Sequence, residues 1–84
     1  MSDDRRVSHE ARRHTLANRV RALRGGMGWS QEHLAEASDL DRTTIGRLEN
    51  ARHANTVDTL WAVADAFGIT LADLVSDSEG HPIQ

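Results

Sequence analysis

Apolar residues recur along this chain at intervals of three and four positions, which is the spacing of one face of an α-helix. The first such stretch contains Leu16, Val20 and Leu23. We expect a helix there that starts at Ser8 or Thr15 and runs to Arg24, because Gly25-Gly26 favours a helix end. Alternation of apolar and polar residues is not sustained anywhere, so no strands are expected. The pattern predicts an all-α protein.

Four further helices are predicted from the residues at their starts. Each follows a residue type that commonly caps the first turn of a helix, namely Ser30, Asp41, Thr56 and Thr70. At three of these starts, an apolar residue before the cap is placed to pack on another inside the first turns, forming a hydrophobic staple. The staple pairs are Trp29 with Leu34, Leu40 with Ile45, and Ile69 with Leu74. The residues predicted to face the core are Leu34, Ala35, Ile45, Leu48, Leu60, Val63, Ala64 and Phe67.

Helix ends and domain limits follow from the same pattern. The turn Ser38-Asp39-Leu40 stops the second helix, and Asn50 is expected to end the third helix in the left-handed conformation. A single domain is expected over residues 15–75, because the chain is too short for two. Residues 76–84 are predicted to be a disordered tail, and residues 1–14 to be an N-terminal arm or an extension of the first helix.

Composition narrows the class of protein. The 84 residues include no cysteine, so disulfides and thiolate metal sites are excluded and a reducing cytoplasm is expected. No apolar run approaches the roughly 20 residues of a membrane helix, and no signal peptide opens the chain. His9 and His14 are five positions apart, whereas a helical zinc motif needs four, so no metal is expected. No arrangement of Ser, His and Asp indicates catalysis, and neither an enzyme nor a cofactor is expected.

Charge is divided unevenly along the chain. All ten basic residues are arginines and lie between Arg5 and Arg52. Residues 1–53 carry eight acidic residues and a net charge of +2, whereas residues 54–84 carry five acidic residues, no base and a net charge of −5. This division is either a basic face for phosphates opposite an acidic face turned away, or an ordinary solvated mixture of charges.

The segment from Gln31 to Glu49 carries the functional argument. Two short helices are joined there by three or four residues, and the apolar positions pack the second helix across the first by one face only. The other face of the second helix presents Arg42, Thr43, Gly46 and Arg47. A helix presented in this way fits the DNA major groove, where the arginine fork bonds guanine O6 and N7 together.

Four segments also carry a family resemblance. They are LANRVRALR (16–24), WSQEHLAE (29–36), LDRTTIGRLEN (40–50) and TVDTLWAVADAFGITLADL (56–74). In these segments the chain resembles the lambda-repressor/Cro-like (XRE-type) helix-turn-helix family. The resemblance implies a five-helix, lambda-repressor-like DNA-binding domain and a sequence-specific transcription regulator. The compact length is also similar to that of the controller proteins of restriction–modification systems.

The resemblance implies roles for individual residues. Base-reading roles fall on Arg42, Thr43 and Arg47. Methyl groups of Thr43 and Thr44 are expected to contact thymine methyls. Phosphate-contacting roles fall on Gln31, which also braces the recognition helix, and on Asn50, Arg52, His53 and Asn55. Arg24 and Glu49 match an ion pair that links the first helix to the end of the third.

Four arginines of the first helix lie outside these matched roles. They are Arg12, Arg13, Arg19 and Arg21. Such a face is either a set of phosphate contacts or a solvated surface, and Arg21 is taken as a phosphate contact.

Three positions depart from the family pattern. Asp39 and Ala51 stand where glycine is usual, at two turns that each need a residue with a positive φ. Asp39 is expected to adopt it in the first turn, and Asn50, in place of Ala51, in the second. Gly46 lies inside a helix, where glycine costs about 1 kcal/mol relative to alanine. Either a close approach to DNA requires Gly46, or the fold tolerates it.

One recognition helix covers only about four or five base pairs, so a homodimer on a double-stranded operator with two half-sites is expected. The predicted interface is Ile69, Leu71, Leu74 and Val75, and Trp61 is expected in the core or in this interface.

Glu32 and Glu36 are either a patch for RNA polymerase or solvated acids. The preferred hypothesis is a prokaryotic regulator that works in the cytoplasm, associated with the nucleoid. The alternative is an antitoxin-like protein-interaction module that binds a toxin or another partner and autoregulates.

Overall fold

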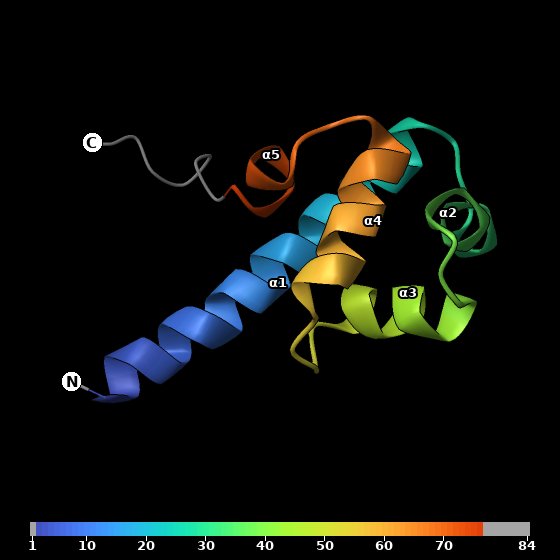
Figure 1. Cartoon of the computed structure of the whole chain (residues 1–84). Coiled ribbons are helices and arrows are strands. Elements are labelled where there is room, and N and C mark those ends of the chain that lie inside the picture. Colours follow the sequence, from blue (N-terminus) through green and yellow to red (C-terminus); the bar gives the residue numbers. More distant parts are fainter. Residues whose placement is uncertain (1, 77–84) are drawn as a thin grey trace.

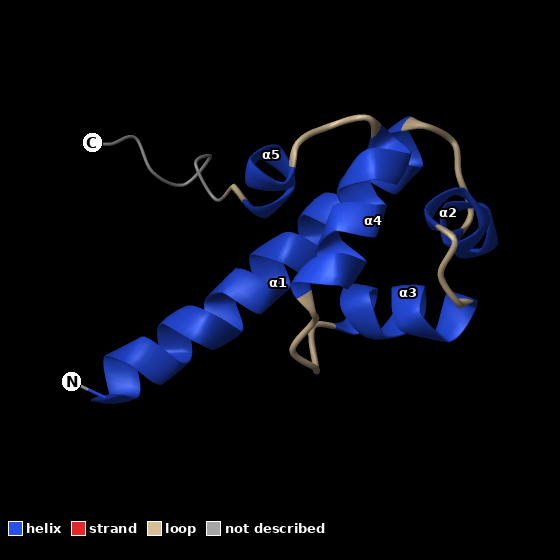
Figure 2. Ribbon diagram, in the orientation of Figure 1, coloured by secondary structure: helices blue, strands red, loops and turns tan. Residues whose placement is uncertain are grey.

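The structure, a computed structural model, describes the backbone of residues 2–76 and the side chains of residues 9–76. This described part contains five α-helices and no strand (Figure 1, Figure 2). The helices are α1 (Ser2–Gly26), α2 (Gln31–Ser38), α3 (Arg42–Asn50), α4 (Val57–Phe67) and α5 (Leu71–Val75). The predicted all-α class and the five helices are therefore confirmed. None of the described helices is both long and apolar enough to cross a membrane.

Helix α1 is longer than the apolar pattern predicts. It begins at Ser2, before both expected starts, and its N-terminal turns project beyond the other helices (Figure 1). No proline or glycine occurs between residues 2 and 24, so nothing in the backbone stops the helix earlier. At the other end α1 includes Gly26, and the positive φ of 71° falls on Gly28. The tail predicted from residue 76 is described only at Ser76, and the rest lies outside the described residues.

Three of the four predicted N-caps are made by a side chain. The hydroxyl oxygens of Ser30, Thr56 and Thr70 accept hydrogen bonds from the backbone N–H three residues later, at 3.0, 3.1 and 3.0 Å. Each bond satisfies one of the donors that a helix start leaves free. Asp41 occupies the N-cap of α3 in an extended conformation, but its side chain makes no capping bond. The start of α3 therefore depends more on packing than the other three starts do.

Two residues other than glycine adopt the left-handed conformation, Asp39 with φ 60° and Ala51 with φ 62°. The first agrees with the expectation. The second corrects it, because we expected Asn50 in this conformation, whereas α3 continues through Asn50 and turns at the next residue. A left-handed turn falls at the position after the last helical residue, so a helix one residue longer moves it to Ala51. Alanine has no side-chain hydrogen bond to offset the strain of this conformation.

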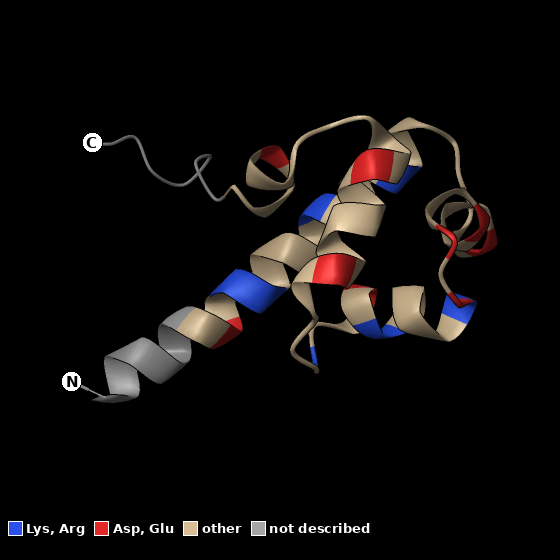
Figure 3. Ribbon diagram, in the orientation of Figure 1, with Lys and Arg blue, Asp and Glu red and all other residues tan. Residues whose placement is uncertain are grey.

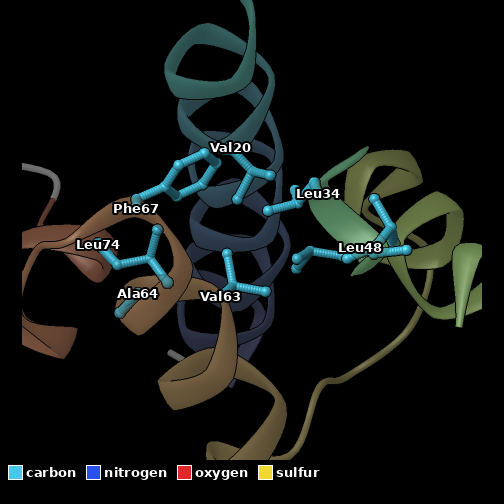
Figure 4. Packing of buried hydrophobic residues seen from close by; sticks show 9 residues of the cluster. Val20, Leu34, Leu48, Val63, Ala64, Phe67 and Leu74 are labelled. Atoms are coloured by element: carbon cyan, nitrogen blue, oxygen red, sulfur yellow. The ribbon is translucent and has the colours of Figure 1, made fainter. Parts of the chain in front are cut away.

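The core lies where α1, α2, α3, α4 and α5 converge (Figure 4). Its largest fully buried side chains are Leu34, Ile45, Leu48, Leu74, Val20 and Val63. The staple residues Trp29, Leu40 and Ile69 pack partly buried against this cluster. Trp29 also stacks on Phe67 at a centroid distance of 5.7 Å, which ties the start of α2 to the end of α4. The core thus holds α2 and α3 in a fixed mutual orientation, and that orientation positions the candidate site.

Candidate nucleic-acid interface

Helix α3 packs on the rest of the domain by one face. Ile45 and Leu48 are fully buried on that face, whereas Arg42, Thr43 and Arg47 on the opposite face are exposed and Thr44 is partly buried. Arg42 and Thr43 lie in the first turn of α3, where a helix that reads base edges makes its contacts, and Arg47 lies in the last turn. The structure therefore brings three of the predicted base-reading residues onto one accessible surface, with Thr44 at its margin.

The arginines of this surface are free to bind a ligand. Within the described part of the chain, neither Arg42 nor Arg47 makes an ion pair or a side-chain hydrogen bond, and Arg52 in the α3–α4 loop makes none either. Figure 3 shows basic positions along the lower edge of the ribbon, on α3 and the loop after it, while the acidic positions of α4 and α5 lie higher. Acidic positions also lie on α2 and at the start of α3, and basic positions on α1, so the basic edge is local to α3 and the loop after it.

The end of α3 is held by a buried carboxylate, Glu49, which is 4% exposed. Arg24 of α1 donates to both of its oxygens, from Nε to Oε2 at 2.8 Å and from Nη2 to Oε1 at 2.9 Å. Gln31, the first residue of α2, donates from Nε2 to Oε1 at 3.0 Å. The remaining Arg24 Nη1 donates to the carbonyl oxygen of Trp29 at 3.0 Å. One carboxylate therefore joins α1, α2 and α3, and we call this set the Glu49 junction.

Such bidentate, charge-assisted bonds are stronger than neutral ones. The hydrogen bonds to Glu49 raise the pKa of the Arg24 guanidinium above its ordinary value, against the opposing effect of burial, and the attraction between the charges adds to the increase. The Arg24 guanidinium therefore stays protonated. Because the junction binds the C-terminal end of α3, it fixes the orientation of α3, and of the exposed arginines on it, relative to α1 and α2.

Two residues expected to contact phosphates have partners inside the protein. The Gln31 amide donates to Glu49 near the end of α3. The Arg21 guanidinium donates to the backbone oxygen of Glu49 and to Oδ1 of Asn18. A phosphate contact from either side chain must therefore use a donor left over from these bonds. The family resemblance implied that Gln31 braces the recognition helix, but it did not identify Glu49 as the partner, because the two residues belong to different helices.

The loop between α3 and α4 presents the remaining phosphate candidates. Arg52 and His53 are exposed, as is Asn50 at the end of α3. Asn55 is partly buried and donates weakly to the carbonyl oxygen of His53 at 3.4 Å. These loop residues follow α3 directly in the chain.

Comparison with known proteins matches residues 20–74 to the HTH_3 helix-turn-helix family. The chain belongs to this helix-turn-helix family. Among curated relatives it is 39% identical over 61 residues to the control protein C.SmaI of Serratia marcescens, covering 73% of each chain. It is 31% identical over 61 residues to the transcriptional regulator SutR of Escherichia coli, covering 73% of this chain but only 34% of SutR. It likewise covers 44% of the immunity repressor of Bacillus phage phi105, so these relatives are much longer proteins.

Solved structures show the same helix-turn-helix architecture. A hypothetical transcription factor from Neisseria has a TM-score of 0.72 and 34% identity, covering 76% of this chain and 74% of the other. The clp gene regulator ClgR of Corynebacterium glutamicum has a TM-score of 0.72 and 29% identity, covering 82% of this chain and 73% of the other. The predicted fold and the family resemblance are both confirmed.

In this helix-turn-helix domain Gly46 stands on the open side of α3. A Cβ at this position would meet no atom of the protein within 4 Å, and the residue has an ordinary helical φ. Nothing within the described fold therefore requires a glycine here. The requirement, where there is one, comes from what binds to this face.

The residues expected to form the dimer interface differ in how far they are buried in the single chain. Leu74 is fully buried in the core of the single chain, and Ile69 and Leu71 pack partly buried against it. Val75 remains 47% exposed, and Trp61 on α4 is 51% exposed. Val57, one turn before Trp61 on the same helix face, is equally exposed and was missed by the sequence reading. The sequence did contain a signal for its exposure, because Val57 does not belong to the core-facing residues of α4, which are Leu60, Val63, Ala64 and Phe67.

Proposed function

We propose that this protein is a sequence-specific DNA-binding transcription regulator that inserts α3 into the major groove. The observation that carries the proposal is the outer face of α3, where Arg42, Thr43 and Arg47 are exposed without partners. An arginine that binds guanine O6 and N7 contributes about 1 to 3 kcal/mol of discrimination. Membership of the helix-turn-helix family supports this placement of the recognition helix.

The loop after α3 then positions the domain on the DNA backbone. Arg52, His53, Asn50 and Asn55 supply donors for phosphate oxygens, and such contacts set the register without reading sequence. Gln31 and Arg21 contribute phosphate contacts through donors that the Glu49 junction does not use. A regulator of this kind works in the cytoplasm on the bacterial nucleoid.

The protein binds its operator as a homodimer, because two half-sites about one helical turn apart give a sequence specificity that a single recognition helix lacks. The exposed apolar side chains available for it are Val57, Trp61 and Val75, with the outer parts of Ile69 and Leu71. Leu74 supports this surface from inside the core. Sedimentation at micromolar concentration is expected to show a dimer with operator DNA, and a monomer both with and without operator contradicts this part of the proposal.

Regulation at a promoter also involves RNA polymerase. Glu32 and Glu36 are exposed on α2, on the side of the helix-turn-helix unit away from its buried residues. They are the carboxylates that we propose for such a contact.

The first experiment is selection from a pool of random-sequence duplexes, followed by sequencing. The parent protein is expected to enrich an inverted repeat. An Arg42→Ala/Arg47→Ala variant is expected to enrich no such repeat, and an Arg42→Lys/Arg47→Lys variant serves as the charge-matched control. Lysine keeps the attraction to phosphate but loses the planar fork, so the control is expected to retain binding to bulk DNA and lose the sequence preference.

Either of two results contradicts the proposal. If the parent enriches nothing above its binding to bulk DNA, the protein is not a sequence reader, and an antitoxin-like interaction with another protein becomes the better hypothesis. If the alanine variant enriches the same repeat as the parent, the bases are not read by Arg42 and Arg47. Raising the salt concentration separates these cases further, because binding through several arginines weakens steeply with salt whereas an apolar protein contact does not.

A further inference from the structure

The N-terminal half of α1 projects beyond the other helices (Figure 1), and nothing in the proposed reading of bases uses it. One face of α1 is apolar where the domain covers it, with Val20 buried in the core and Leu16 packed against it. Toward the N-terminus the same face carries Arg13, Arg12 and His9, which follow at helical spacing. We call these three residues the α1 basic stripe. The face of α1 thus changes from apolar to basic as the helix leaves the core.

The α1 basic stripe borders the loop between α3 and α4, because residues of both line one groove of about 430 Å³. The lining residues are His9, Arg12, Arg13, Thr15, Leu16, Ala54, Asn55, Leu60 and Val75. They include two arginines and no acidic residue. Figure 3 likewise shows basic positions on the projecting part of α1 beside the loop that follows α3. The groove therefore places the stripe next to Asn55, a member of the loop that we propose to contact phosphates.

The guanidinium groups of the stripe are free to bind a ligand. Arg12 is exposed and makes neither an ion pair nor a side-chain hydrogen bond within the described part of the chain. The Nε atom of Arg13 is buried and bonds no acceptor among the described residues, although Thr15 and Asn55 carry oxygen atoms in the same groove. A buried donor without a partner is unfavourable and rare in native proteins. An acceptor brought by a ligand would therefore improve the position of Arg13.

We propose that Arg12 and Arg13 bind a phosphate of the DNA backbone, next to the phosphates contacted by the α3–α4 loop. This inference rests on the proposed function, and it gives a role to the part of α1 that extends beyond the core. A guanidinium suits phosphate oxygens because it can bond them through two parallel N–H groups. A second copy of the chain fits this face less well, because a two-fold contact would bring the same arginines of both copies together.

A phosphate contact from α1 has a different signature from the contacts of α3. It adds affinity for every DNA sequence equally, because the backbone carries no sequence information. Each phosphate that the protein neutralises also releases condensed counterions, and this adds about 0.9 to the steepness with which the logarithm of the binding constant falls with the logarithm of salt concentration. The stripe therefore raises affinity and salt dependence without changing the preferred operator.

The test is a titration of the full chain with the selected operator and with a duplex of unrelated sequence, over a series of salt concentrations. Arg12→Gln and Arg13→Gln are each expected to weaken binding to both duplexes by the same factor, several-fold at low salt. Each is expected to reduce the salt slope by about 0.9. The matched control is Arg19→Gln, which removes one charge from the same helix. Because Arg19 Nε already donates to the backbone oxygen of Asp73 at 2.8 Å, this control is expected to leave the slope unchanged.

Ethylation of single phosphates locates the contact on the DNA, because an ethylated phosphate has lost its charge. We expect a phosphate whose ethylation weakens binding of the parent and has no effect on an Arg12→Gln/Arg13→Gln variant. Arg12 is exposed, so Arg12→Gln alone decides the case if Arg13→Gln alters the fold.

Three results overturn the inference. If the salt slopes of Arg12→Gln and Arg13→Gln equal that of Arg19→Gln, the stripe is an ordinary solvated surface. If these variants change the sequence preference, the stripe contacts bases instead of phosphates. If they change the sedimentation of the protein without DNA, the stripe belongs to a contact between copies of the chain.

The failure of the proposed function is recognised separately. A parent that binds both duplexes equally is not a sequence reader, but the salt slopes on the unrelated duplex still test Arg12 and Arg13. A parent that binds neither duplex refutes the proposed function and the inference together.

Discussion

The arginines of this domain fall into two regions that differ in what their guanidinium groups meet. Arg24 in the Glu49 junction is bound to the Glu49 carboxylate, and Arg21 beside it is bound to the backbone oxygen of Glu49. On the outer face of α3, Arg42 and Arg47 have no partner within the described residues. The same residue type therefore stabilises the fold in one region and remains available to a ligand in the other. What separates the two roles is the presence of an acceptor within reach, which the tertiary structure decides.

This comparison predicts the largest effect for Glu49→Ala. The substitution leaves Arg24 and Gln31 without their acceptor in a partly buried place, and the loss of one partner of a buried pair costs about 3 to 5 kcal/mol. Because Arg24 keeps some contact with water, we expect a loss near the lower limit, about 3 kcal/mol. Urea unfolding measures this change. Glu36→Ala, an exposed acid on α2, is the control and is expected to change the free energy of unfolding by less than about 0.5 kcal/mol.

Arg47→Ala is expected to give the opposite pattern. The free energy of unfolding should stay within about 0.5 kcal/mol of the parent, while affinity for the selected operator should fall by about 1 to 3 kcal/mol. Titration of operator duplex alongside urea unfolding measures both quantities. A large loss of stability in this variant would show that the outer face of α3 is structural, and the contrast between the two regions would then fail.

Gly46→Ala sharpens the comparison within α3 itself. Because a Cβ meets no protein atom there, the substitution should stabilise the domain by up to about 1 kcal/mol through helix propensity. It should nevertheless weaken operator binding if this face approaches DNA closely. Gly25→Ala is the matched control, since Gly25 is also helical and a Cβ there also meets nothing. The control should leave operator binding unchanged, and equal binding by both variants would mean that Gly46 is merely tolerated.

The smallest effect is expected for Ala51→Gly. Relief of the left-handed strain at φ 62° is worth about 1 to 2 kcal/mol, but the freer unfolded chain offsets about 0.4 to 1 kcal/mol of it. A net stabilisation of about 0.5 kcal/mol follows from these two effects, and thermal unfolding measures it. Ala54→Gly in the same loop is the control, because Ala54 has no positive φ. It should destabilise the domain, and a stabilisation of equal size there would refute the strain argument.

Much of the fold was predictable because its signals are local. A helix start depends on the cap residue and the three or four residues after it, so Ser30, Thr56 and Thr70 could be recognised one by one. The exposed face of α3 was predictable for the same reason, since the 3.6-residue period divides a short helix into two sides. The exact end of α3 was not predictable, because Asn50 is the residue type favoured in a left-handed turn, whereas the turn falls one residue later, at Ala51.

The sequence by itself determined the five helices, the side-chain caps at Ser30, Thr56 and Thr70, the basic N-terminal portion and the family, all of which depend on residues close together in the chain. The tertiary structure alone decided that Gln31 bonds Glu49, that Leu74 belongs to the core, and that Arg13 faces a groove beside Val75. Each of these facts joins residues of different helices. Which partner a side chain meets there depends on the angles between packed helices, and those angles follow from the shape of the whole core.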